Sequence, residues 1–136
     1  MISVLLVDDD PALFNITKIL LEKEGELSVD LCSSAIEALE KLAIRDYDTI
    51  VSDYDMPVMN GIQFLRQIRN NGDRTPFIIF TGKGNEDVVI EALNNGADYY
   101  LKKVGDPKEI FSELRSVILE KTKIRIGILP NNKIRD

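Results

Sequence analysis

The sequence contains no histidine, and this absence excludes several kinds of chemistry. Histidine-ligated metal sites, serine or cysteine triads of the usual type and any role as a phosphohistidine donor all need an imidazole. The one cysteine, Cys32, cannot form an internal disulfide, and beside Leu31 it is expected to be a small buried apolar residue. Any chemistry must therefore use carboxylates, hydroxyls and lysines.

Long hydrophobic segments are also missing. No apolar run approaches the roughly 18 residues that a membrane-spanning helix needs, and the N-terminus enters a strand-like pattern without the features of a signal peptide. We therefore expect a cytoplasmic protein without membrane contact. The formal net charge of −6 argues against direct DNA binding, because DNA phosphates would repel the domain as a whole.

The length and composition are those of one globular domain. The chain has 136 residues, of which 44% are hydrophobic and 29% are charged, and both fractions are ordinary for a folded protein. We predict a domain over residues 1–122 and a basic C-terminal tail or linker over residues 123–136. Ile124, Ile126 and Ile128 alternate like a short strand that could pair with another chain, whereas a flexible end is the simpler interpretation.

Short apolar runs alternate along the chain with stretches of helical period. The runs predict strands over residues 2–7, 27–31, 49–51, 77–80 and 99–101. Such alternation is typical of βαβ units, in which a parallel sheet is covered by helices on both faces. We predict an α/β fold, the flavodoxin-like doubly wound three-layer sandwich with strand order 2-1-3-4-5.

A helix is predicted after each of these strands. Asp10 and Pro11 form an N-cap followed by proline at the first helical position, while Gly25, Gly72 and Gly96 stand where helices should end. The apolar stripes that predict the five helices are Leu13, Ile16 and Leu20; Ala35, Ala38, Leu39 and Leu42; Leu65 and Ile68; Val89, Ala92 and Leu93; and Ile110, Leu114, Val117 and Ile118.

Polar residues that could bind a ligand or react follow the predicted strands. Asp8 and Asp9 follow the first strand and Asp53 the third, and these strands are neighbours in the predicted order. Two such charges about 4 Å apart repel by about 4 kcal/mol at an effective dielectric constant near 20, so a cation is expected between them. Hard oxygen ligands favour Mg²⁺, with Mn²⁺ possible. Thr81 and Lys102, after the fourth and fifth strands, can then approach an anion bound to the metal.

Each of these residues alone also has a plain structural interpretation as a loop acid, a turn residue or a surface charge. Their combination is more specific. Four separated motifs extend to the ends of predicted strands one, three, four and five, in this order along the chain. They are LVDDD at 6–10, SDYDMPVMNG at 52–61, FTG at 80–82 and GADYYLK at 96–102. With them the chain resembles, over residues 1 to about 121, the receiver domain of two-component response regulators.

The resemblance implies a metal site and a phosphoacceptor. Asp53 would accept a phosphoryl group, and Asp8, Asp9 and Asp53 would hold Mg²⁺ together with the backbone carbonyl of Asp55. The donor would be a sensor histidine kinase or a histidine phosphotransfer protein. The chain would then be a single-domain signalling protein, and not an enzyme acting on a separate substrate.

The resemblance also implies a switch. Lys102 would pair with the phosphoryl oxygens, Thr81 would move to hydrogen-bond them, and Tyr99 would be the aromatic residue that changes rotamer with Thr81. The face formed by the fourth helix, the fifth strand and the fifth helix would bind a downstream protein or a second copy of the chain. Family members usually carry a proline after the active-site lysine, often with a cis peptide. Here Lys103 follows Lys102, so a trans bond is expected.

Two other functions stay open from the sequence. A pseudo-receiver would keep the fold as an interaction module without the chemistry. A haloacid-dehalogenase-type phosphatase would use Asp53 and Asp55 as its Asp-x-Asp pair. That motif normally closes the first strand and has Thr or Val where Pro57 stands here, and the sequence offers no cap segment.

Overall fold

The computed structural model describes residues 1–130 and contains one parallel sheet. Its order is β2-β1-β3-β4-β5, which confirms the predicted doubly wound topology. The predicted strands begin at the observed residues and, after the first, end one residue too early. The strands are β1 (Ile2–Val7), β2 (Leu27–Cys32), β3 (Thr49–Ser52), β4 (Phe77–Thr81) and β5 (Tyr99–Lys102).

A helix follows each strand, as predicted. Each begins after a side chain that caps its first N–H groups; Asp10, for example, accepts from Ala12 N–H at 3.1 Å. No helix within residues 1–130 is long and apolar enough to cross a membrane. The helices are α1 (Pro11–Glu22), α2 (Ala35–Leu42), α3 (Gly61–Asn70), α4 (Glu86–Asn94) and α5 (Pro107–Arg125).

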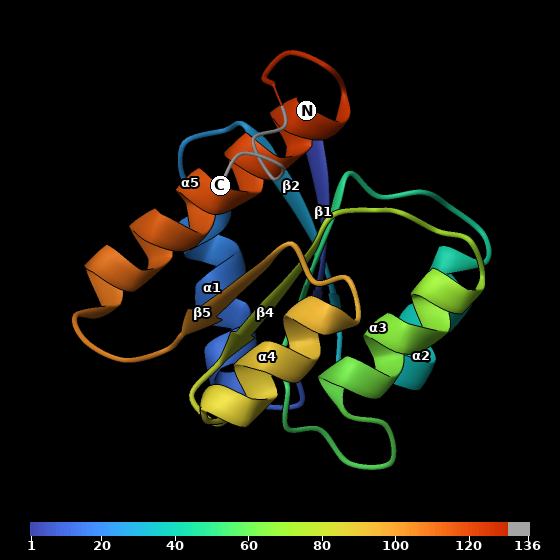
Figure 1. The fold of residues 1–136 in the computed structure, drawn as a ribbon. Helices are drawn as coiled ribbons and strands as arrows, with labels where there is room; N and C mark the ends of the chain where they lie inside the picture. The colour runs from blue at the N-terminus through green and yellow to red at the C-terminus, as the bar shows by residue number, and fades with distance from the viewer. Residues whose placement is uncertain (131–136) are drawn as a thin grey trace.

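The helices form a layer on each face of the sheet (Figure 1). Alternate residues of the strands separate into two cores: Leu5 and Val7 of β1 pack with α2, α3 and α4, while Val4 and Leu6 pack with α1 and α5. Cys32 lies in the first core with no exposed surface, and burial raises the pKa of its thiol to about 11. The expectation of a buried, unpaired cysteine is therefore confirmed.

Helix α1 turns a different side to the sheet from the one predicted. Thr17 and Leu21 are its buried residues, while Ile16 is 53% exposed and Leu20 is 36% exposed. The predicted stripe of Leu13, Ile16 and Leu20 is therefore wrong in its rotation about the helix axis. Thr17 can be buried because its hydroxyl donates to the backbone oxygen of Leu13 at 2.6 Å, so its polarity was a misleading signal.

The C-terminal isoleucines do not form the strand that their alternation suggested. Ile124 belongs to α5, and Ile126 is the residue at which that helix ends. Helical hydrogen bonds continue through the basic last turn, where Lys123 and Arg125 favourably face the negative end of the helix dipole. The predicted boundary between residues 122 and 123 therefore falls inside α5; the last part of the predicted tail, residues 131–136, lies outside the described residues.

Val58 has an unusual backbone in the loop between β3 and α3. Its φ is 71°, in the left-handed region that β-branched residues avoid, and it is the one non-glycine residue among residues 1–130 with positive φ. The N–H of Met59 donates to the backbone oxygen of Pro57 at 2.8 Å, which closes a tight turn around Val58. The valine side chain is 93% exposed and gains almost no burial in return.

Replacing Val58 should therefore stabilise the protein. We expect Val58→Asn to raise the free energy of unfolding by about 1 kcal/mol, because asparagine tolerates the left-handed region better. Urea denaturation followed by circular dichroism measures this change. Val58→Thr is the matched control, since threonine is polar but still β-branched and should give no gain. Equal stabilisation by both variants would show that polarity, and not backbone strain, is responsible.

Candidate functional site

Two acidic residues follow β1 at the carboxyl edge of the sheet. Asp8 is 4% exposed, whereas Asp9 is exposed. One carboxylate oxygen of Asp8 accepts from the N–H of Asp10 at 2.9 Å, and the other accepts from Nζ of Lys103 at 2.7 Å. Both oxygens of this buried carboxylate therefore have a partner.

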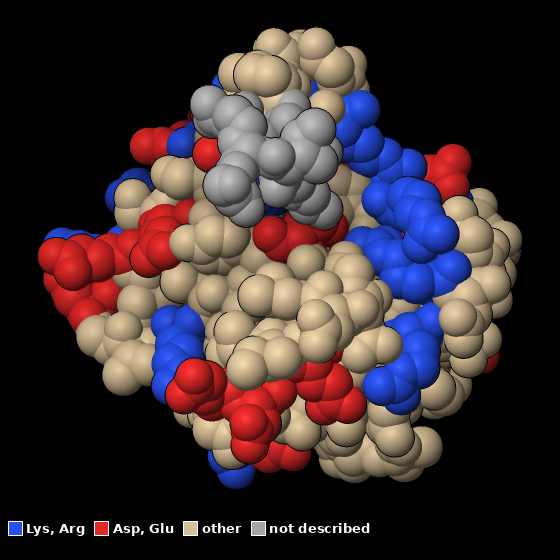
Figure 2. Space-filling model, in the orientation of Figure 1, with Lys and Arg blue, Asp and Glu red and all other residues tan. Residues whose placement is uncertain are grey.

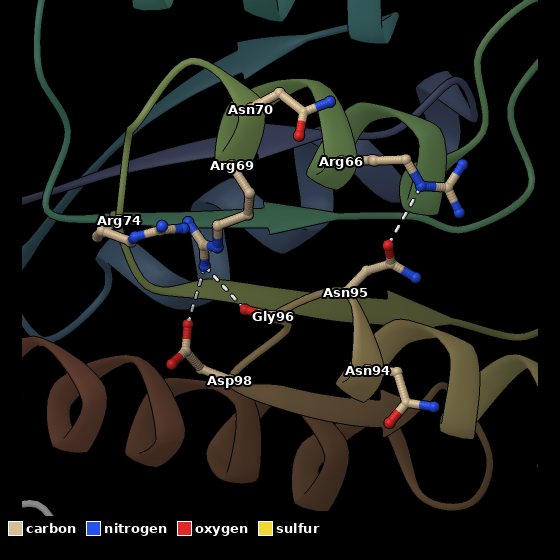
Figure 3. A pocket seen from close by; sticks show the side chains of 8 residues that line it. All are labelled: Arg66, Arg69, Asn70, Arg74, Asn94, Asn95, Gly96 and Asp98. Carbon is tan, nitrogen blue, oxygen red and sulfur yellow. Dashed lines mark hydrogen bonds and ion pairs between the residues drawn. The ribbon is translucent and has the colours of Figure 1, made fainter.

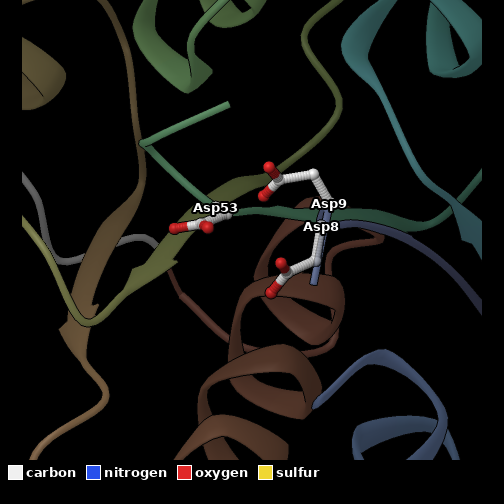
Figure 4. A group of neighbouring side chains, drawn as sticks. All are labelled: Asp8, Asp9 and Asp53. Atoms are coloured by element: carbon white, nitrogen blue, oxygen red, sulfur yellow. The ribbon is translucent and has the colours of Figure 1, made fainter. Parts of the chain in front are cut away.

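Asp53 is brought to the same place by the pairing of β3 with β1. Its N–H donates to the backbone oxygen of Val7 at 2.9 Å and continues the sheet ladder by one residue. One ligand oxygen from each of Asp8, Asp9 and Asp53 lies within 4.8 Å of the others (Figure 4). The predicted convergence of three carboxylates is therefore present.

The environment of Asp53 disfavours its charged form. Burial raises the pKa of Asp53, and the negative charge of Asp8 adds to the rise. A hydrogen bond with the Thr81 side chain, the positive charge of Lys103 and the N–H of Tyr54, which donates at 2.8 Å, all oppose it. A cation at this point would favour the carboxylate further.

The lysine at the site is Lys103, and not Lys102. Lys102 is exposed and does not line the cleft, whereas the Lys103 ammonium bonds to Asp8 and lies 5.1 Å from the centre of the Phe80 ring. Successive strand residues point to opposite faces, so adjacent lysines cannot share one environment. All described peptide bonds are trans, as expected for the bond between the two lysines.

The aromatic residue beside the Thr81 loop is Tyr100, and not Tyr99. Tyr99 packs with the α1 and α5 core, and its hydroxyl donates to Glu113 at 3.1 Å. The Tyr100 hydroxyl instead donates to the backbone oxygen of Lys83 at 3.0 Å. The alternation along β5 places Tyr99 and Leu101 against the α1 and α5 core and Tyr100 against the core of α2, α3 and α4. The sequence shows this alternation but not which side of β5 faces which core, so it did not distinguish Tyr100 and Lys103 from their neighbours.

The loop after Asp53 adds a second charged pair to the site. Asp55 and Lys83 are both exposed and their charged atoms lie 3.3 Å apart, so this ion pair contributes little stability. Further along, Gly61 lies against the backbone of Asp53: a Cβ at this position would be 2.3 Å from the Asp53 carbonyl oxygen. Glycine is therefore required for α3 to start so close to Asp53.

These residues surround an open cleft with a volume of about 430 Å³. Its chemistry suits a hard cation, because carboxylates are the only metal-binding side chains around it. The Lys103 ammonium and the Thr81 hydroxyl, opposite these carboxylates, suit an anion that is bound to the same cation. The lining residues are Asp8, Asp9, Asp10, Leu13, Asp53, Asp55, Thr81, Gly82, Lys83 and Lys103.

Known proteins agree with this geometry. The response regulator receiver domain profile matches residues 4–115. Response regulator Rre1 of Synechocystis is 33% identical over 119 residues, which are 86% of this chain and 52% of Rre1. Response regulator MprA of Mycobacterium leprae is 34% identical over 120 residues, 88% of this chain and 52% of MprA. The chain thus spans about half the length of these relatives.

Solved structures share the fold across nearly their whole length. The receiver domain of the Francisella response regulator 1452 has a TM-score of 0.82 and 29% identity, covering 92% of this chain and 99% of that one. The chemotaxis response regulator CheY4 of Vibrio cholerae has a TM-score of 0.76 and 29% identity, covering 86% and 98%. With its acidic cluster at the expected edge of a matching fold, this chain belongs to the receiver domain family of two-component response regulators.

Proposed function

We propose that this domain accepts a phosphoryl group on Asp53 from a phosphohistidine of a sensor histidine kinase or histidine phosphotransfer protein. The observation that carries the proposal is the convergence of Asp8, Asp9 and Asp53 within 4.8 Å of one another, with Lys103 bound to Asp8. Family membership supports the same function. The proposal concerns this domain alone, because the chain spans only about half the length of its relatives.

The acidic cluster fits Mg²⁺, with Mn²⁺ as the other candidate. The carboxylates of Asp8, Asp9 and Asp53 and the backbone carbonyl of Asp55 would hold it, leaving coordination positions for water and phosphoryl oxygens. Bound Mg²⁺ would supply positive charge that offsets the repulsion between the carboxylates and the incoming phosphoryl group. The exposed side chain of Asp55 pairs with Lys83, which agrees with a role for its backbone.

The transfer needs little covalent chemistry from the protein. A carboxylate oxygen of Asp53 attacks the phosphorus, the bond from phosphorus to the histidine nitrogen breaks, and the imidazole leaves with that electron pair and takes up a proton. The product is an acyl phosphate. Lys103 takes the role that the sequence analysis gave to Lys102 and pairs with the phosphoryl oxygens, and the Thr81 hydroxyl donates to another.

Switching would begin at Thr81. A phosphoryl group adds about two negative charges, and the Thr81 hydroxyl, which already bonds to Asp53, would shift to donate to a phosphoryl oxygen. Tyr100 takes the role first given to Tyr99, because its hydroxyl is bound to the loop that follows Thr81, at Lys83. This would change the surface of α4, β5 and α5, where a downstream protein or a second copy of the chain would bind.

A surface for the phosphodonor protein adjoins the cleft. Leu13 lines the cleft, and further along α1 the side chains of Ile16, Ile19 and Leu20 are 53%, 67% and 36% exposed. Apolar side chains that remain exposed together next to a reactive site are typical of a protein interface. A donor protein seated on α1 would have its histidine close to Asp53.

The alternatives are less well supported. A pseudo-receiver would not need the complete set of three carboxylates, hydroxyl and lysine that lines the cleft. A dehalogenase-type phosphatase would need Asp55 as a free acid, whereas its carboxylate pairs with Lys83. Asp53 also follows the third strand of the chain, and not the first.

Phosphorylation should require the carboxylate of Asp53 but not that of Asp55, which lies in the loop that follows it. Incubation with labelled acetyl phosphate and Mg²⁺ should label the wild type, and Asp53→Asn should lose the label because no carboxylate remains to form the acyl phosphate. Asp55→Asn is the matched control and should still be labelled, since its expected metal ligand is the backbone carbonyl. A wild type that takes no label would favour the pseudo-receiver.

Magnesium binding should distinguish the two adjacent lysines. Lys103→Met removes a cation that competes for Asp8, so the dissociation constant for Mg²⁺ should fall by roughly tenfold, the effect of about 1.4 kcal/mol. Lys102→Met should leave it within about twofold, because screened surface charges interact weakly. Isothermal titration calorimetry measures both. If the two variants change affinity equally, the assignment of Lys103 to the site is wrong.

The lifetime of the acyl phosphate should change when either member of the Asp55–Lys83 ion pair is replaced. Asp55 and Lys83 lie at the mouth of the cleft and influence how water reaches the phosphoryl group. We expect Asp55→Ala and Lys83→Ala each to change the dephosphorylation rate without abolishing phosphorylation, as measured by loss of label over time. Decay identical to wild type in both variants would contradict this expectation.

A further inference from the structure

A second cleft lies at the opposite end of the sheet from the acidic cluster. It has a volume of about 520 Å³, within the usual size of small-molecule sites. Its walls are the outer side of α3, the segment that leads into β4 and the turn from α4 into β5 (Figure 3). The lining residues are Arg66, Arg69, Asn70, Arg74, Asn94, Asn95, Gly96 and Asp98.

The charge of this cleft is opposite to that of the protein. The chain carries a net charge of −6, yet three arginines converge here, and basic side chains gather in a band on the right of the face shown in Figure 2. Asp98 is the one carboxylate in the lining, and it accepts from Arg69 at 3.3 Å and from the N–H of Phe77 at 2.8 Å. The cleft is therefore rich in donors.

Arg69 forms the floor of the cleft and is already engaged. It donates to the backbone oxygens of Asp73, Thr75 and Gly96, each at 2.9 Å, and its side chain is only 12% exposed. Burial lowers its pKa, the negative charges of Asp98 and Asp73 oppose this fall, and the positive charge of Arg74 adds to it. An anion bound at the rim would add to the negative charge that offsets Arg74, while Arg69 keeps its structural bonds.

The two outer arginines are available to a ligand. Arg74 is exposed and makes no hydrogen bond or ion pair with any residue in the range 1–130. Arg66 donates to Asn95 at 3.2 Å and lies 3.5 Å from Glu91, in a pair whose side chains are both about half exposed. Such exposed contacts are weak and can be exchanged for stronger bidentate bonds to phosphate.

We propose that this cleft binds a small molecule that carries two or more phosphate groups. Arg66 stands at one end and Arg74 with Arg69 at the other, so two separated anionic groups fit better than one (Figure 3). The lining has no aromatic side chain on which a base could stack, which disfavours recognition through a nucleobase. The amides of Asn70 and Asn94 suit phosphate oxygens or hydroxyls. Inorganic oligophosphates and phosphorylated polyols share this chemistry.

Calorimetric titration of the full chain with inorganic pyrophosphate tests the proposal. The buffer should contain EDTA and no Mg²⁺, so that the acidic cluster repels the probe. We expect binding that weakens as salt rises, and a loss of affinity of about tenfold or more in the double variant Arg66→Gln, Arg74→Gln, which removes two charge-assisted contacts. Arg69 is left unchanged because the fold depends on it.

Three comparisons make the test specific. The double variant Lys23→Gln, Lys108→Gln removes the same two charges from exposed sites elsewhere and should bind within about twofold of wild type. Arg66→Lys, Arg74→Lys keeps the charge but loses the bidentate geometry, so it should bind with intermediate affinity. Asp53→Asn should bind pyrophosphate as the wild type does, which would show that the probe does not bind at the phosphoacceptor.

The remaining probes identify the ligand's source or overturn the proposal. Inositol bisphosphate bound more tightly than pyrophosphate would indicate a phosphorylated polyol, and the reverse order an oligophosphate. Binding of an acidic peptide without pyrophosphate binding would overturn the proposal in favour of a protein interface. The proposal would equally fail if pyrophosphate did not bind at millimolar concentration, or bound equally well to Arg66→Gln, Arg74→Gln.

Discussion

The ion pair between Asp8 and Lys103 holds the functional end of this domain together. It joins residues 95 positions apart, and both side chains are largely buried. A buried carboxylate without a partner would be costly, so the pair offsets the cost of burying Asp8 beside Asp53. The same lysine is thereby fixed at the one place where it can meet an anion bound to Asp53. Stability and the proposed chemistry therefore depend on the same contact.

The parallel sheet explains why chemistry collects at its ends. Strands that run in one direction bring all their carboxyl ends to one edge, where the loops after β1, β3 and β5 supply the acids and the lysine and the last residue of β4 supplies the hydroxyl. The opposite edge receives the segments that enter the strands, and there the arginines gather. One domain can thus carry a cation-seeking site and an anion-seeking site that are separated by the length of the sheet.

The strained turn at Val58 lies in the loop that connects the phosphoacceptor to α3. This loop is held at its end by Gly61, whose hydrogen in place of a side chain allows contact with the Asp53 backbone. Close packing at Gly61 and an unfavourable backbone at Val58 belong to the same short connection. Strain of this kind persists where the surrounding structure determines the path of the chain, and functional sites are common among such places.

The sequence alone determined the strand order and the three carboxylates, because buried parallel strands are continuous apolar runs and residues after them must meet at one edge. It could not decide which of two adjacent lysines or tyrosines faces the site, since a shift of one residue along β5 exchanges the two faces. The structure decided for Lys103 and Tyr100. It also joined Arg66 on α3 with Arg74 beyond it, and with the α4 turn, into one cleft; only tertiary packing brings these segments together.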